Sequence, residues 1–255
     1  MSSQESTPSL PGGLCNRTLD AIVEANGLTE VGAPFRSLAS PMSPDPVGTV
    51  RIFRGDGAVE KVVYVGLAVP AIGLDSHMVF AFTRGDSVVP HFTLDSVQGQ
   101  GSYAFHLDLI PRAELATHLA YVDWAHTPLT ATYDEVEARA GLSKAAIGPR
   151  QYAMMSPWML VHRAEEDAFA GIEDAVRAYF EHWVSLLAGD VPGEVVADVA
   201  DTDLATRDLR NRANIFNPDV DKVWAQVQQL IGAEQAEAVR TLLLDNSIPA
   251  LEVSA

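Results

Sequence analysis

The stretch LDSHMVFAFTRGDSVVPHFTLDSVQGQGSYAFHLDLIP, residues 74–111, decides the fold of this 255-residue chain. Three runs rich in β-branched and aromatic residues are separated by two turn-like segments, RGDS at 84–87 and QGQG at 98–101. Such runs between turn residues are typical of consecutive antiparallel strands. We therefore predict a three-stranded antiparallel meander over this stretch.

Polar side chains inside the second of these strands are its unusual feature. Residues two apart on a strand share a face, so His91, Thr93 and Asp95 point to one face of the sheet. Phe92 and Leu94 point to the other face. One interpretation is the polar outer face of an antiparallel sheet. The other is a pocket of proton donors, because a carboxyl group in apolar surroundings has a raised pKa and keeps its proton near neutral pH.

The two neighbouring strands carry further histidines. His77 shares a face with Val79 and Ala81 on the preceding strand, and His106 shares a face with Asp108 on the following one. Three of the 7 histidines therefore lie on adjacent strands, with at least one acid among them. The same two interpretations, a polar outer face or a pocket, apply to these residues.

The flanking sequence predicts further strands and a series of helices. Apolar residues at helical spacing predict helices over residues 14–27, 112–121, 133–140, 164–188, 203–214, 220–231 and 233–244. Further strands are predicted over residues 49–54, 61–69 and 151–163. We expect an α/β/α three-layer sandwich, in which helices flank both faces of a largely antiparallel sheet of six or seven strands. Residues 14–255 would form a single domain after a disordered tail of residues 1–13.

Composition and charge exclude several classes of protein. The single cysteine, Cys15, excludes an internal disulfide and any cysteine-rich metal or iron–sulfur site. A formal charge of −17 argues against nucleic acid or an anionic membrane as a partner. No apolar run reaches the length of a membrane span and no secretory signal is recognisable, so we expect a cytoplasmic protein. No phosphate-binding glycine motif is present either, and we predict a colourless protein without bound flavin, haem, iron–sulfur cluster or other metal.

A set of short motifs follows in a fixed order within residues 90–115. They are the tripeptide PHF at 90–92, Asp95, Gln98 and the segment DLIPRAEL at 108–115. In their order and spacing the chain resembles the ferredoxin-dependent bilin reductases, and most closely their plant relative, red chlorophyll catabolite reductase. The resemblance extends over about residues 47–244 and is strongest at 90–115.

The resemblance implies reduction of a linear tetrapyrrole, a bilin or a chlorophyll catabolite, by single electrons from reduced ferredoxin. Enzymes of this family bind no cofactor, and the protein supplies the protons. Asp95 and Asp219 would be two acids on opposite sides of the tetrapyrrole plane. The position of the second acid is counted back from Gly232. A slip in that count leaves Asp221 and Asp208 open as alternatives.

Other side chains would bind the substrate. His91 and His77 would hydrogen-bond the pyrrolinone oxygens or relay protons. Arginine side chains would pair with the propionate groups, and the sequence does not choose among the arginines. The substrate-binding residues that the resemblance suggests are Phe92, Thr93, Arg163, Arg207, Arg210 and Arg212.

A transient complex with an acidic ferredoxin would need a basic patch on this acidic chain. Arg51, Arg54, Lys61 and Arg84 lie near the ends of expected strands and are the candidates for it. Scattered surface charges are the alternative interpretation of these residues. A homodimer is left open.

Two other functions remain open. His106 and Asp108 form a His-x-Asp element, and His162 follows later in the chain. This is the ligand set of non-haem iron oxygenases, and metal analysis of the pure protein distinguishes it from a bilin reductase. The third possibility is a non-catalytic carrier of a tetrapyrrole or another small molecule, which would use the same pocket.

Overall fold

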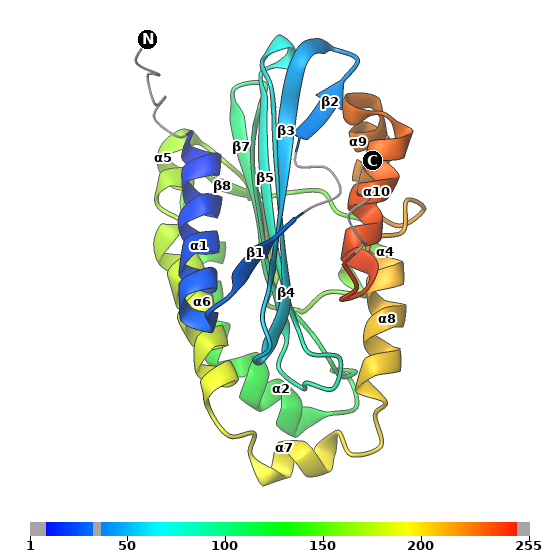
Figure 1. The fold of residues 1–255 in the computed structure, drawn as a ribbon. Helices are drawn as coiled ribbons and strands as arrows, with labels where there is room; N and C mark the ends of the chain where they lie inside the picture. Colours follow the sequence, from blue (N-terminus) through cyan, green and yellow to red (C-terminus); the bar gives the residue numbers. More distant parts are fainter. Residues whose placement is uncertain (1–8, 33–36, 249–255) are drawn as a thin grey trace, which may run out of the picture.

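The computed structural model describes residues 9–32 and 37–248, so residues 1–8 of the expected tail lie outside the described part of the chain. A β-sheet stands between two layers of helices (Figure 1). The expected three-layer sandwich is therefore confirmed. Among the described residues no helix combines the length and the apolar character needed to span a bilayer.

The described residues form ten α-helices. They are α1 (Leu10–Asn26), α2 (Leu119–Ala125), α3 (Thr130–Glu137), α4 (Pro149–Tyr152), α5 (Glu166–Ala170), α6 (Glu173–Ala188), α7 (Gly193–Asp198), α8 (Leu204–Ile215), α9 (Val223–Ile231) and α10 (Ala233–Leu244). Helices α1 and α6 cover one face of the sheet, and α8, α9 and α10 cover the other (Figure 1).

The sheet contains nine strands within the described residues, and every pairing is antiparallel. Their order is β1-β3-β4-β5-β6-β7-β9-β8, with β2 beside β3. The strands are β1 (Thr29–Val31), β2 (Ser37–Ser40), β3 (Ser43–Arg54), β4 (Val59–Val69), β5 (Leu74–Thr83), β6 (His91–Gly99), β7 (Ser102–Ile110), β8 (Leu142–Lys144) and β9 (Leu160–Ala164). The expected six or seven strands were too few, because β1, β2 and β8 have only three or four residues, which is too short for a periodic pattern in the sequence to reveal them.

The predicted meander is confirmed as β5, β6 and β7. Gly99 pairs with Ser102, so the turn between β6 and β7 has two residues, Gln100 and Gly101. Both have positive φ, 52° and 81°, as a tight hairpin turn requires.

Each face of the sheet carries its own hydrophobic core. Leu19 of α1 and Trp183 of α6 belong to the first core, and Trp224 of α9 and Leu242 of α10 belong to the second. Consecutive side chains of a strand point to opposite faces of the sheet, so odd- and even-numbered residues of the same strand enter different cores.

The first helix begins earlier than expected. Ser9 precedes α1, and its hydroxyl accepts a hydrogen bond from the backbone N–H of Gly12. Pro11 occupies the first turn, where its missing N–H costs nothing. Residues 10–13 of the expected tail are therefore helical.

Three other boundaries also differ from the predictions. Strand β9 begins at Leu160 instead of residue 151, and the expected helix over 164–188 is divided at Gly171 into α5 and α6. The expected helix over 112–121 begins only at Leu119. The preceding segment is tied to the core, since the backbone N–H of Arg112 donates to the hydroxyl of Tyr121.

Candidate functional site

A pocket of about 340 Å³ lies between the sheet and helix α9. Small-molecule sites typically have volumes of about 300–1,000 Å³. Three titratable side chains line this pocket, Asp95 of β6, His106 of β7 and Asp221 just before α9. The rest of the wall is mainly hydrophobic and includes Leu67, Met78, Phe80, Val161, Trp224 and Leu230.

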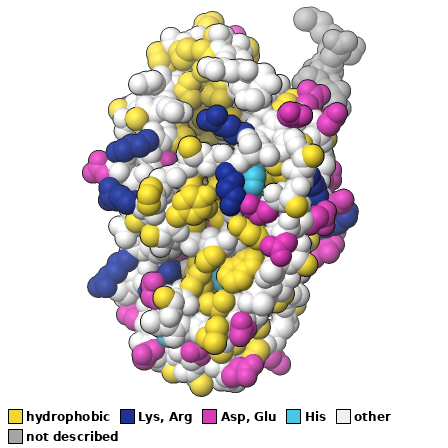
Figure 2. Space-filling model, turned by 180° about the vertical axis from the view of Figure 1, so that it is seen from behind, with side chains coloured by type: hydrophobic (Ala, Val, Ile, Leu, Met, Phe, Trp, Pro, Cys, Tyr) yellow, Lys and Arg dark blue, Asp and Glu magenta, His cyan; other side chains and the backbone are white. Residues whose placement is uncertain are grey.

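The pocket reaches the edge of the sheet at β9 and β8. Val161 of β9 and Ala145, which follows β8, both line it. Figure 2 shows the molecule from the side of this edge. Hydrophobic side chains lie in a recess in the upper part of this face, with Lys and Arg side chains beside them (Figure 2).

Asp95 and His106 form the polar centre of the pocket floor. They are directly opposite each other on β6 and β7, and Asp95 Oδ2 lies 3.3 Å from His106 Nδ1. The Asp95 side chain is 33% exposed and that of His106 is 16% exposed. The second polar atom of each, Asp95 Oδ1 and His106 Nε2, is buried without a hydrogen-bond partner among the described residues. A ligand with both donors and acceptors would satisfy them.

Charges around His106 favour its protonated form. Burial lowers the pKa of His106, but the hydrogen bond to Asp95 and the negative charges of Asp95, Asp108 and Asp221 outweigh it, so the pKa is raised. Asp108 is fully buried on the same face and accepts hydrogen bonds from the backbone N–H and the hydroxyl of Ser156. Burial raises the pKa of Asp108.

Asp221 supplies the second carboxyl group of the pocket. Burial raises the pKa of Asp221, and the charge of Asp95 raises it further, against a hydrogen bond from the backbone N–H of Val223. The predicted second acid, Asp219, has a side chain that is 87% exposed and does not line the pocket. Of the carboxyl groups in this loop, the pocket is lined by the alternative Asp221 and not by Asp219.

His91 shares the face of Asp95 but lies outside the pocket in a closed network. Its Nδ1 accepts a hydrogen bond from the backbone N–H of Thr83, so the proton of the neutral ring is on Nε2 and is donated to Asp208, 2.7 Å away. Burial and the nearby Arg112 lower the pKa of His91 to about 3. The hydrogen bond from His91 and the charges of Arg112 and Arg212 hold the pKa of Asp208 below its usual value, against the effect of burial. The imidazole of His91 is therefore held in this buried network and does not line the pocket.

Two predicted residues belong to the opposite face of the sheet. His77 Nδ1 lies 2.8 Å from the hydroxyl of Tyr64, and its Nε2 lies 2.9 Å from Asp75 Oδ1. Phe92 packs against Phe180 and Trp183 in the first core. Neither residue reaches the pocket of Asp95.

Thr93 lies on the pocket face, opposite Asp108, but is fully buried below the pocket. Its hydroxyl has no hydrogen-bond partner among the described residues. The structure therefore leaves Thr93 as a support of the floor between His91 and Asp95.

The four predicted arginines have different environments. Arg212 is buried, donates to the carbonyl of Leu243 and lies 3.6 Å above the ring of Phe82. Arg207 pairs with Glu114. Arg207 and Arg210 line a separate hollow along α8, away from Asp95.

Arg163 is the remaining arginine of this group. It is exposed on β9 and shares a face with Ala104, its partner on β7, which lines the pocket. Of the four predicted arginines, it is the one placed beside the candidate site.

The residues proposed for a basic patch do not form one. Lys61 is fully buried, and its ammonium donates to the carbonyls of Asp245 and Ser247. Burial and the charge of Arg212 lower the pKa of Lys61 to about 8. Arg51 forms an ion pair with Glu30, and Arg84 forms one with Asp86, so the positive charges of both arginines are offset. Arg54 is exposed.

The iron-binding alternative requires three residues that the sheet separates. His106 and Asp108 are on the face of the pocket, whereas His162 pairs with Phe105 on the other face and stacks on its ring. His162 Nε2 lies 3.2 Å from Glu137. The described residues contain no group of three or more His, Cys, Asp or Glu side chains placed to hold a metal.

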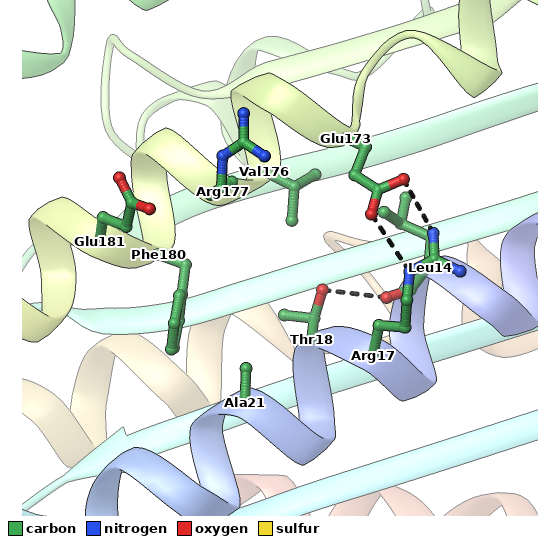
Figure 3. Close-up of a pocket in the computed structure, with 9 residues that line it drawn as sticks. All are labelled: Leu14, Arg17, Thr18, Ala21, Glu173, Val176, Arg177, Phe180 and Glu181. Carbon is green, nitrogen blue, oxygen red and sulfur yellow. Dashed lines mark hydrogen bonds and ion pairs between the residues drawn. The ribbon is translucent and has the colours of Figure 1, made fainter.

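A second pocket of about 260 Å³ lies between α1 and α6 (Figure 3). Leu14, Val176 and Phe180 form its apolar part, and an ion pair between Arg17 and Glu173 closes one end. The side chains of this pair are 59% and 55% exposed, so water screens them. This groove lies on the opposite side of the sheet from Asp95 and contains no sequestered proton donor.

The chain was compared with known proteins. No protein-family model matches it, and no curated protein is similar to it in sequence. Among solved structures, the crystal structure of phytochromobilin synthase from tomato in complex with biliverdin is similar. The two chains are 15% identical with a TM-score of 0.68, and the match covers 92% of this chain and 82% of the other. The chain therefore shares the fold of that enzyme.

Proposed function

We propose that this chain reduces a linear tetrapyrrole with electrons from ferredoxin, as a member of the bilin reductase superfamily. The observation that carries the proposal is the apolar pocket in which Asp95, His106 and Asp221 converge, with polar atoms that have no partner among the described residues. The fold shared with an enzyme crystallised with biliverdin supports it. The closer relation to red chlorophyll catabolite reductase stays a prediction.

The arrangement of the acids suits proton delivery to a flat ligand. Reduction of one double bond consumes two electrons and two protons, and ferredoxin supplies the electrons singly. Asp95 and His106 lie on the sheet, whereas Asp221 lies at the start of the helix layer. A tetrapyrrole between them would meet a proton donor on each face. The raised pKa values of His106 and Asp221 keep protons available nearer to neutral pH.

The carboxylate groups of the substrate would lie at the edge of the sheet. In the part of the chain that the structure describes, two carboxyl groups line the pocket and no Lys or Arg does. An ionised propionate inside would be desolvated and repelled. We assign the propionate contact to Arg163, which is exposed on β9 and shares a face with Ala104 of the pocket wall.

Anaerobic turnover tests the proposal. Biliverdin is incubated with the protein, reduced ferredoxin and an electron supply, and the absorption spectrum is followed. We expect loss of the biliverdin band and formation of a reduced bilin only when protein and ferredoxin are both present. Parallel assays with red chlorophyll catabolite identify the preferred substrate. Binding without turnover of either compound would favour the non-catalytic carrier instead.

A further inference from the structure

Trp224 of α9 has a polar atom for which the described part of the chain supplies no partner. The residue is 5% exposed and lines the pocket of Asp95. Its indole N–H is buried and has no hydrogen-bond partner among the described residues. Buried polar groups in folded proteins nearly always have a partner, so this N–H requires an explanation.

The indole N–H groups of two other tryptophans of the chain are hydrogen-bonded within the protein. The indole N–H of Trp158 donates to the hydroxyl of Thr130 over 2.9 Å, and that of Trp183 donates to the carbonyl of Pro90 over 2.8 Å. Trp183 is fully buried in the opposite core. Unlike these two groups, the N–H of Trp224 has no acceptor among the described residues, and Trp224 lies in the wall of the candidate site. A ligand in the pocket can therefore act as the acceptor.

The charges of the pocket restrict what that acceptor can be. Asp95 and Asp221 line the pocket, and among the described residues no Lys or Arg lines it. An anionic acceptor would be repelled by any ionised carboxylate beside it, and the indole N–H adds no positive charge to offset this. A neutral carbonyl oxygen meets no such penalty.

We propose that Trp224 is a specificity-determining residue, whose indole N–H donates to a neutral carbonyl oxygen of the ligand. This rests on the function proposed above, under which the acceptor is the lactam oxygen of a terminal ring of the tetrapyrrole. Trp224 then selects bilins that carry this oxygen, while Asp95, His106 and Asp221 act on the double bonds. The contact belongs to binding and moves no proton.

The test is an equilibrium titration of the protein with biliverdin, followed by bilin absorbance. Trp224→Phe keeps an aromatic ring in the second core but removes the N–H. We expect it to bind biliverdin about 10-fold more weakly than the wild type, which corresponds to about 1.4 kcal/mol. Trp124→Phe is the matched control, because Trp124 packs against the opposite core, and it should bind with unchanged affinity.

Two altered ligands locate the acceptor atom. A linear tetrapyrrole that lacks both terminal oxygens should bind equally to the wild type and to Trp224→Phe, because the hydrogen bond has been removed from the ligand side. The dimethyl ester of biliverdin, in which the propionates are neutral, should still show the 10-fold difference. Loss of the difference with the ester would assign the contact to a propionate and overturn the proposal.

Different results would contradict the role of Trp224 and the proposed function. Equal affinity of the wild type and Trp224→Phe for biliverdin overturns the role of Trp224 and leaves the proposed function intact. Failure of the wild type to bind any linear tetrapyrrole overturns both. Should Trp224→Phe not fold, the comparison of biliverdin with the tetrapyrrole lacking terminal oxygens on the wild type still decides. The former should bind about 10-fold more tightly, and equal affinities would contradict the role of Trp224.

Discussion

Asp95 and His106 face each other directly across strands β6 and β7, with a carboxylate oxygen 3.3 Å from a ring nitrogen. Each side chain keeps one buried polar atom without a partner among the described residues. Because the pKa of His106 is raised, its ring supplies an exchangeable proton at the floor of an apolar pocket. The predictions below test this pair, the acid across the pocket from it and the network that supports them.

Replacing Asp95 should separate binding from turnover. Asp95→Asn keeps size and polarity but does not donate a proton readily. We expect biliverdin affinity within a few-fold of the wild type and turnover reduced by about 10²–10⁴-fold, the usual contribution of a general acid. Anaerobic assays with reduced ferredoxin measure both. Asp75→Asn is the control on the opposite face and should retain wild-type turnover; full turnover by Asp95→Asn would move the donor role elsewhere.

Asp221 and Asp219 test the register of the loop before α9. Asp221 lines the pocket, whereas the side chain of Asp219 is 87% exposed. We expect Asp221→Asn to lower the turnover of biliverdin by at least 10²-fold and Asp219→Asn to change it by less than two-fold. The reverse outcome would restore the assignment made from the sequence.

The charge on His106 should be visible in the stability of the protein. Its pKa is raised in the folded protein, so the stability from this charge is fully present below pH 6.5, the ordinary histidine value, and is lost as pH rises through the higher folded-state pKa. His106→Gln should therefore unfold more easily than the wild type at pH 6, by about 1 kcal/mol. The difference should shrink towards pH 9. Urea denaturation across this range measures it, and a constant difference would show that His106 does not titrate as described.

Asp208 should matter for folding. It lies 2.7 Å from His91 Nε2 and 3.2 Å from a guanidinium nitrogen of Arg112, and Arg212 is also close. Asp208→Asn removes the nearest counter-charge of two buried guanidinium groups, and we expect a loss of about 3–5 kcal/mol in the free energy of unfolding at pH 7. Because the pKa of Asp208 is lowered in the folded protein, this stabilisation is present above pH 3.8 and is lost as pH falls through the lower folded-state value. A loss below 1 kcal/mol would mean that the network contributes little.

The meander and the two faces of β6 could be predicted from sequence because both depend on local alternation. The pairing of Asp95 with His106 could also have been predicted from the sequence. A two-residue turn at Gln100 and Gly101 places these residues opposite each other, but the predicted turn covered residues 98–101 and did not fix the register. His106 was consequently considered as one of several histidines on neighbouring strands and as an iron ligand, and not as the partner of Asp95.

Other parts of the site depend on tertiary contacts that no local pattern reports. Asp219 and Asp221 lie in one loop, and its backbone path decides which carboxyl group enters the pocket. Arg212 carries the guanidinium group expected of a propionate-binding residue, yet this group is buried against the ring of Phe82. Asp208, which accepts from His91, and Arg112, which pairs with Asp208, come from segments distant from His91 in the chain. Such networks form only when the helix layer packs on the sheet.

The structure of the protein crystallised with biliverdin under anaerobic conditions tests the central claim most directly. We expect the bilin between the sheet and α9, with the carboxyl groups of Asp95 and Asp221 on opposite faces of the tetrapyrrole plane and the propionates towards Arg163. Biliverdin in the groove between α1 and α6, or at the surface away from Asp95, would contradict the assignment of the site.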